Sequence, residues 1–116
     1  MTKLSVHFSR PEFECKCGCG LDTVDSELIY ALELVRSKFK RSILIISGAR
    51  CKEHNILIGG AGKSQHLRCK AADFIIKDTS PNEVYESLLN LFPDKYGLGN
   101  YRRWTHLDVR EEMARW

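Results

Sequence analysis

Apolar residues recur at spacings of three and four in two segments of the chain, and this pattern predicts two amphipathic helices. The first, SELIYALELVRSKF at residues 26–39, follows Asp25, a residue type that caps helix N-termini. Its apolar stripe consists of Leu28, Leu32, Val35 and Phe39. The second helix is predicted to begin at Ser80-Pro81, because proline is favoured at the first helical position. Its stripe consists of Val84, Leu88 and Leu91.

Three other segments have the pattern of β-strands. Residues 42–47, SILIIS, form a short apolar run rich in isoleucine, and residues 71–76, AADFII, form a second apolar run. Both are predicted to be buried strands. Residues 104–110, WTHLDVR, alternate between two kinds of side chain, which is typical of a strand with two different faces. One face carries Thr105, Leu107 and Val109, and the other carries Trp104, His106, Asp108 and Arg110.

The remaining segments read as loops and turns. Residues 48–64 are rich in glycine and have no regular period, so we expect a long loop with one helical turn at 52–57. Gly97 and Gly99 mark a turn before the last strand. The whole pattern predicts one small α+β domain over residues 1–116, with helices flanking an antiparallel sheet.

Composition and charge narrow the function classes. The 116 residues have a formal net charge of +3, and the basic residues are scattered, which does not support nucleic-acid binding. No apolar run is long enough to span a bilayer, so we expect no membrane insertion. The opening MTKLSVHFSRPEF lacks the apolar core of a signal peptide. We therefore expect a protein made in the cytoplasm that reaches any other compartment by release or delivery.

The cysteines leave two interpretations open. Their number, five, is odd and no secretion signal is visible, so we expect free thiols and no obligatory disulfide. Cys15, Cys17 and Cys19 resemble a zinc knuckle, but familiar zinc sites combine C-x2-C with a second, distant pair. The favoured interpretation is a tight turn with small buried thiols, and a structural zinc is the alternative.

A candidate metal site centres on Asp73, a carboxylate inside the apolar run AADFII. A buried carboxylate is expensive unless it loses its charge, meets a cation or binds a metal. A turn over residues 67–70 would bring His66 to the same point, and His106 would approach from the last strand. Two imidazoles and one carboxylate, with a fourth position open to water, describe a catalytic zinc site.

The motifs around these residues resemble those of the M15 family of zinc D,D- and L,D-peptidases, which includes phage endolysins and shares its metal-site plan with the hedgehog signalling domain. The resemblance runs through SGARCKEHNILIGGAGKSQHLRCKAADF and YGLGNYRRWTHLDVR, and the opening HFSRPEFECKCGCG is also similar. It implies a hedgehog- or D,D-peptidase-like fold. It also implies one zinc ion, bound by His66, Asp73 and His106.

The same resemblance implies roles for two further residues and shows two departures. Arg50 matches an arginine that faces the substrate's carboxylate or carbonyl, and Ser64 matches a serine that contacts substrate or loop. Cys69 stands where the family usually has glycine, so either the turn adapts or the thiol approaches the metal. The family's general base lies two or three residues before the last zinc histidine, where this chain has Trp104 and Arg103.

Asp108 is the nearest alternative carboxylate to His106, and its role has two interpretations. It is either the general base or a residue that orients a metal ligand. The sequence does not separate these roles, because the two residues share one strand face in both cases.

Three hypotheses for function follow. The first is a monomeric zinc peptidase, either carboxypeptidase or endopeptidase, that cuts peptidoglycan stem peptides at the cell wall, as phage lysis or virion-associated enzymes do. The second is a zinc-binding module of the same fold that has lost its general base. The third is a redox or zinc-knuckle interaction protein built on the cysteines. Turnover separates the first two, and metal stoichiometry separates the third.

Overall fold

The structure, a computed structural model, describes residues 3–116 and confirms the α+β class. Its elements, in chain order, are the 3-10 turn η1 (Arg10–Phe13), α1 (Ser26–Phe39), β1 (Ile43–Ser47), α2 (Lys52–Leu57), the 3-10 turn η2 (Gln65–Arg68), β2 (Ala71–Ile76), α3 (Pro81–Leu91), β3 (Gly97–Asn100), β4 (Thr105–Asp108) and β5 (Ala114–Arg115). Both predicted helices begin where expected, because the side chains of Asp25 and Ser80 accept backbone hydrogen bonds at their N-termini.

The five strands form one sheet in the order β1-β2-β4-β3-β5. The predicted antiparallel arrangement holds for the first four strands, but β3 and β5 pair in parallel, so the sheet is mixed. Gly97 and Gly99, predicted to lie in a turn, belong to strand β3, and the sequence pattern did not predict β5 either. The prediction that residues 42–47 form a buried strand was also wrong. β1 is an edge strand, and Leu44 and Ile46 on one of its faces are exposed.

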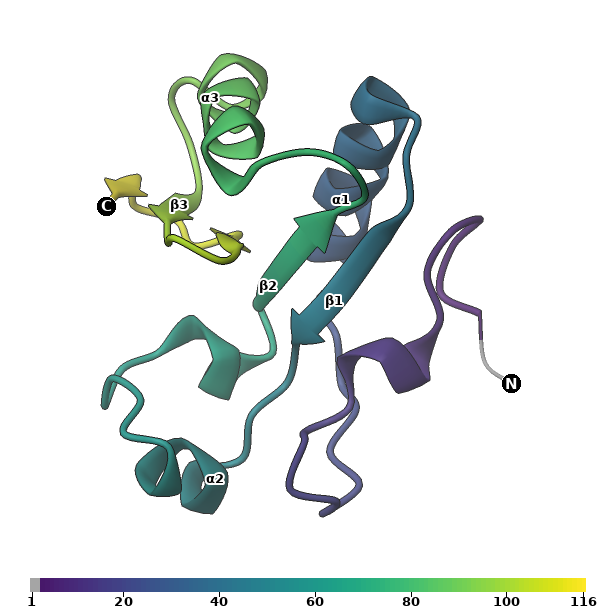
Figure 1. Cartoon of the computed structure of the whole chain (residues 1–116). Helices are drawn as coiled ribbons and strands as arrows, with labels where there is room; N and C mark the ends of the chain where they lie inside the picture. The colour runs from purple at the N-terminus through teal and green to yellow at the C-terminus, as the bar shows by residue number, and fades with distance from the viewer. Residues whose placement is uncertain (1–2) are drawn as a thin grey trace.

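The hydrophobic core lies between one face of the sheet and the helices α1 and α3 (Figure 1). Ala72, Phe74 and Leu107 point into this core from β2 and β4. Because side chains alternate along a strand, Asp73 and His106 project from the opposite face. The segment between β1 and β2, with α2 and η2, lies beyond the ends of these strands (Figure 1).

The N-terminal segment packs closely on the end of β1. Ala49 N donates a hydrogen bond to Phe13 O at 2.8 Å. Gly48 permits this approach, since a Cβ at that position would lie 2.7 Å from Phe13 Cα. The segment therefore supports the chain at the point where it leaves the sheet. No helix among residues 3–116 is long and apolar enough to cross a membrane.

Candidate active site

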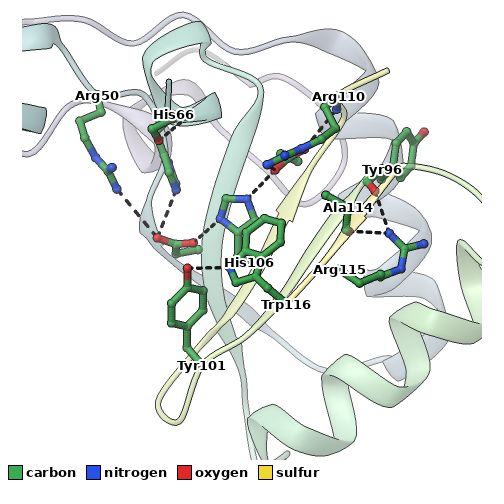
Figure 2. Close-up of polar contacts among 12 residues, drawn as sticks. Arg50, His66, Tyr96, Tyr101, His106, Arg110, Ala114, Arg115 and Trp116 are labelled. Atoms are coloured by element: carbon green, nitrogen blue, oxygen red, sulfur yellow. Dashed lines mark hydrogen bonds and ion pairs between the residues drawn. The ribbon is translucent and has the colours of Figure 1, made fainter. Parts of the chain in front are cut away.

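The three predicted metal ligands lie together on one face of the sheet. Asp73 of β2 and His106 of β4 are directly opposite each other in the antiparallel ladder. Asp73 Oδ1 lies 2.9 Å from His106 Nδ1, and Asp73 Oδ2 lies 3.2 Å from Nε2 of His66. One ligand atom from each residue lies within 4.8 Å of the others, and all three residues are buried. Figure 2 shows the two imidazoles pointing at the same carboxylate.

The turn η2 places His66 at this point, as the sequence analysis expected. Ser64 Oγ caps η2 by accepting a hydrogen bond from His66 N at 3.2 Å. Cys69 ends the turn with a left-handed backbone, φ +59°, and its N–H bonds back to the carbonyls of the turn. The turn therefore keeps the conformation that glycine favours, and the cysteine accepts it at a cost of roughly 1–2 kcal/mol. Cys69 is not part of the metal-ligand group.

The hydrogen bonds of His66 fix which ring nitrogen can bind a metal. Nδ1 lies 2.7 Å from Gly48 O. A carbonyl only accepts, so Nδ1 carries the hydrogen and Nε2 of the neutral ring has a free lone pair. That Nε2 is buried without a hydrogen-bond partner and faces Asp73. A buried, unpartnered lone pair beside a carboxylate fits a bound cation.

His106 is oriented by a second carboxylate on its other side. Its Nε2 lies 2.7 Å from Asp108 Oδ2, which leaves Nδ1 directed at Asp73. Burial lowers the pKa of His106, but hydrogen bonds to Asp108 and Asp73 outweigh this effect and raise it above its ordinary value. Burial raises the pKa of Asp73, but the hydrogen bond from His106 and the closeness of the His66 ring lower it to about 2. The site therefore stabilises a positive charge between Asp73 and His106, which is the kind of charge that a bound metal ion carries.

Asp108 itself is fully buried and contacts the ring nitrogen of His106 that does not face Asp73. Nε and Nη2 of Arg110 bind its two oxygens at 2.8 and 2.7 Å. Burial alone would raise the Asp108 pKa, but these bonds and that of His106 hold it well below its usual range. Gly97 leaves room for this pair, because a Cβ there would lie 2.5 Å from the carboxylate oxygens. We therefore revise the predicted catalytic role of Asp108, whose geometry fits the orienting alternative.

The metal-ligand group opens into a pocket of about 630 Å³, which His66, Asp73 and His106 line together with Arg50 and Ser64. The guanidinium of Arg50 is buried, and its Nη2 lies 4.0 Å from Asp73 Oδ2. Its Nη1 donates to Asn55 Oδ1 at 3.0 Å, whereas its Nε is buried without a partner. Arg50 is therefore held beside the metal-ligand group, and not all of its N–H groups have a hydrogen-bond acceptor.

An aromatic wall that was not predicted from the sequence forms the other side of the pocket. The rings of Tyr101 and Trp104 stack with centroids 5.1 Å apart. Trp116 packs on His106 at 5.0 Å, and its Nε1 donates a hydrogen bond to Tyr101 Oη at 2.8 Å. Figure 2 shows Tyr101 and Trp116 beside the metal-ligand group. Tyr101 and Trp104 lie in the stretch that resembles the M15 family, but the resemblance gives them no role in a pocket wall. Pairing of β5 with β3 brings Trp116 here.

The family model described as Peptidase M15 matches residues 6–108, which include the whole metal-ligand group, Arg50 and the cysteine-rich turn. No curated protein gives a significant match. Trp116 lies beyond the matched region.

Proposed function

Because the chain belongs to the M15 family of peptidases, we propose that it is a zinc peptidase that cleaves a D-amino-acid-containing bond of peptidoglycan stem peptides. The observation that carries this proposal is the group of His66, Asp73 and His106 at the floor of a pocket. Membership of M15 supports zinc-dependent peptidase activity. The choice of peptidoglycan rests on the motif resemblance and on the basic residues Arg50 and Lys63 in the pocket, which suit a peptide carboxylate.

The residues would hold the metal through His66 Nε2, a carboxylate oxygen of Asp73 and His106 Nδ1. When bound, zinc supplies a Lewis acid for the scissile carbonyl and lowers the pKa of a water molecule. Gly48 O and Asp108 fix the two imidazole tautomers, so that both ligand nitrogens present lone pairs. The peptide is then oriented at a preformed site.

Arg50 is the substrate-binding residue of this proposal. A guanidinium offers a planar fork of donors that matches a carboxylate or a polarised carbonyl. Tyr101 supports the opposite side of the substrate, because its Oη accepts from Trp116 Nε1 and keeps its own O–H to donate. Ser64 lines the pocket, but its Oγ already accepts a bond from His66 N, so its first contribution is to shape the turn.

A second candidate function is favoured by the absence of a visible general base. Asp73 has the one carboxylate side chain among the described residues that line the pocket, and it belongs to the metal-ligand group. Arg103 and Trp104 occupy the positions where the family carries its base. The same fold could therefore serve as a non-catalytic zinc-binding module, which would bind the stem peptide without cutting it.

Digestion of purified peptidoglycan tests the proposal. Zinc-loaded protein should release stem-peptide fragments whose masses identify the bond that is cut, and His66→Ala should release none. Tight binding of zinc without any released fragment would support the non-catalytic module instead. We propose that the natural setting is cell-wall lysis or virion entry by a monomer, which a lysis assay on intact cells exposed to the protein from outside would examine.

A further inference from the structure

A second group of possible metal ligands lies at the cysteine-rich turn, outside the pocket. The thiols of Cys15, Cys17, Cys19 and Cys51 all lie within 4.8 Å of one another. Cys17 Sγ is 3.5 Å from Cys15 Sγ and 3.5 Å from Cys51 Sγ. Cys51 supplies the fourth thiol, which the CKCGC motif itself does not contain. The fifth cysteine, Cys69, is not in the group.

The spacing of these sulfur atoms fits one tetrahedral ion. A zinc–sulfur bond of about 2.3 Å places the four sulfur atoms of a tetrahedral site about 3.8 Å apart. Disulfide bonding would require a pair at about 2.05 Å, and all five cysteines are free thiols in the structure. Four thiols around one point match the four-cysteine structural sites that zinc occupies most often.

The backbone around the cluster brings the thiols together. Gly18 lies between Cys17 and Cys19, and Gly20 follows Cys19. Their φ values are left-handed, +84° and +92°, and no atom lies within 4 Å of where a Cβ would stand at either. Cys15 N donates to Leu21 O at 2.7 Å, which closes the turn. The N–H of Cys51 donates to Cys15 Sγ at 3.4 Å. Backbone N–H groups directed at sulfur stabilise negative charge on metal-bound thiolates.

We propose that Cys15, Cys17, Cys19 and Cys51 bind a structural zinc ion, separate from the ion of the pocket. Four sulfur ligands complete the coordination of zinc and leave no position for a substrate, so this ion holds the fold. It ties the N-terminal turn to the residue that follows Arg50. The proposed function does not depend on this ion, because the pocket's ligands lie elsewhere.

The zinc content of the purified full-length chain tests this proposal. We expect about two zinc ions per wild-type chain and about one in Cys17→Ser. Because the side chain of Cys17 is exposed, this substitution removes little packing, and the fold should depend on it only through the metal. Cys69→Ser, which removes the one cysteine outside the cluster, is the matched control and should keep two. His66→Ala should lose only the pocket ion, and combining it with Cys17→Ser should leave none.

Cobalt substitution provides a measurement that does not need a cysteine variant to fold. In His66→Ala, bound Co²⁺ should give intense thiolate-to-cobalt charge-transfer absorption in the near ultraviolet, together with the visible bands of tetrahedral cobalt. A wild-type content of one zinc that Cys17→Ser leaves unchanged would overturn the proposal. So would a disulfide among the four cysteines in freshly purified protein, or a cobalt spectrum without sulfur bands.

Discussion

The two clusters of metal-ligand side chains differ in ligand type, in number and in the elements that carry them. The pocket cluster has three nitrogen and oxygen ligands, two of which stand on paired strands. The cysteine cluster has four sulfur ligands on two loops, with Cys17 and Cys19 exposed. Three ligands beside a pocket leave a coordination position for chemistry, whereas four thiolates leave none. The first arrangement suits catalysis and the second suits stabilisation.

The two clusters meet at one short segment, residues 48–51. Gly48 O accepts from His66 Nδ1, Arg50 enters the pocket, and Cys51 joins the cysteine cluster. Arg50 N also donates to His66 O at 3.1 Å. The strand-borne ligands need little further support, since the sheet fixes them. The segment that positions His66 and Arg50 leaves the sheet and gains its support from the N-terminal turn.

The largest expected effect is that of removing a pocket ligand. His66→Ala should lower kcat/KM by at least about a thousandfold, because the metal contributes several kcal/mol to transition-state stabilisation. The fold should persist, and circular dichroism with zinc analysis on the same preparation checks this. Full activity in a variant that has lost the pocket zinc would refute the catalytic role of this cluster.

The second prediction concerns stability. In a His66→Ala background, which isolates the cysteine cluster, Cys17→Ser should lower the free energy of unfolding by about 4 kcal/mol, the contribution of an ion present at about a thousand times its Kd. Urea unfolding curves measure the change, and chelation of the parent should reproduce it. Cys69→Ser, at a buried position outside the cluster, is the control and should keep the full response to chelation. If chelator leaves the unfolding midpoint of the parent unchanged, the cysteine cluster holds no stabilising ion.

The sequence predicts the strand-borne part of the pocket well. An apolar run with one carboxylate is a strong local pattern, and alternation along the strands decides which face Asp73 and His106 share. The helices could be predicted equally well, because their apolar stripes and capping residues are local features of the sequence. The sequence did not show that residues 42–47 form an edge strand, because SILIIS has the same composition whether one or both of its neighbours are strands.

The parts that were missed depend on contacts between distant residues. The segment GLGN has no strand pattern and becomes β3 because small residues fit against Asp108 and Trp116. Cys51 lies 34 residues from Cys17, so the CKCGC motif alone cannot reveal a fourth ligand. Trp116 reaches the pocket only through the parallel pairing of β5 with β3.

The third prediction separates the two roles of Asp108. Asp108→Asn can donate an N–H to His106 Nε2, which would place the ring hydrogen on Nδ1, facing the metal. Zinc affinity should then fall about 10- to 100-fold, the usual effect of changing a group that orients a ligand. Activity at saturating zinc should largely recover. A loss of about 100-fold or more that persists at saturating zinc would instead identify Asp108 as the general base.

The fourth prediction concerns substrate binding by Arg50. Arg50→Ala should lower kcat/KM roughly ten- to a hundredfold and leave pocket zinc in place, because a charge-assisted hydrogen bond contributes about 1.5–3 kcal/mol. Arg50→Lys should recover part of the loss, since an ammonium lacks the planar fork. Arg102→Ala, an exposed arginine nearby, is the control. Normal kinetics with a lowered melting temperature would make Arg50 a structural residue.

The smallest expected effect tests the aromatic wall. Tyr101→Phe removes one O–H from the pocket, and if that O–H donates to the substrate in the transition state, kcat should fall about fivefold, the worth of one hydrogen bond. Stability should change little, because Trp116 is 43% exposed and water can replace its lost acceptor. Tyr30→Phe, on an exposed tyrosine of α1, controls for the substitution itself.

Trp116→Phe separates a direct contribution of Tyr101 from one that acts through Trp116. This variant keeps an aromatic ring beside His106 and removes the N–H that Tyr101 Oη accepts, together with part of the indole surface. If Tyr101 merely holds Trp116 in place, both variants lose the same hydrogen bond and should show the same kinetics. If Tyr101 contacts substrate, Trp116→Phe should retain most of the activity that Tyr101→Phe loses. Equal losses of activity in both variants would therefore show that the aromatic wall only shapes the pocket. A larger loss in Tyr101→Phe would show that the tyrosine hydroxyl contacts the substrate.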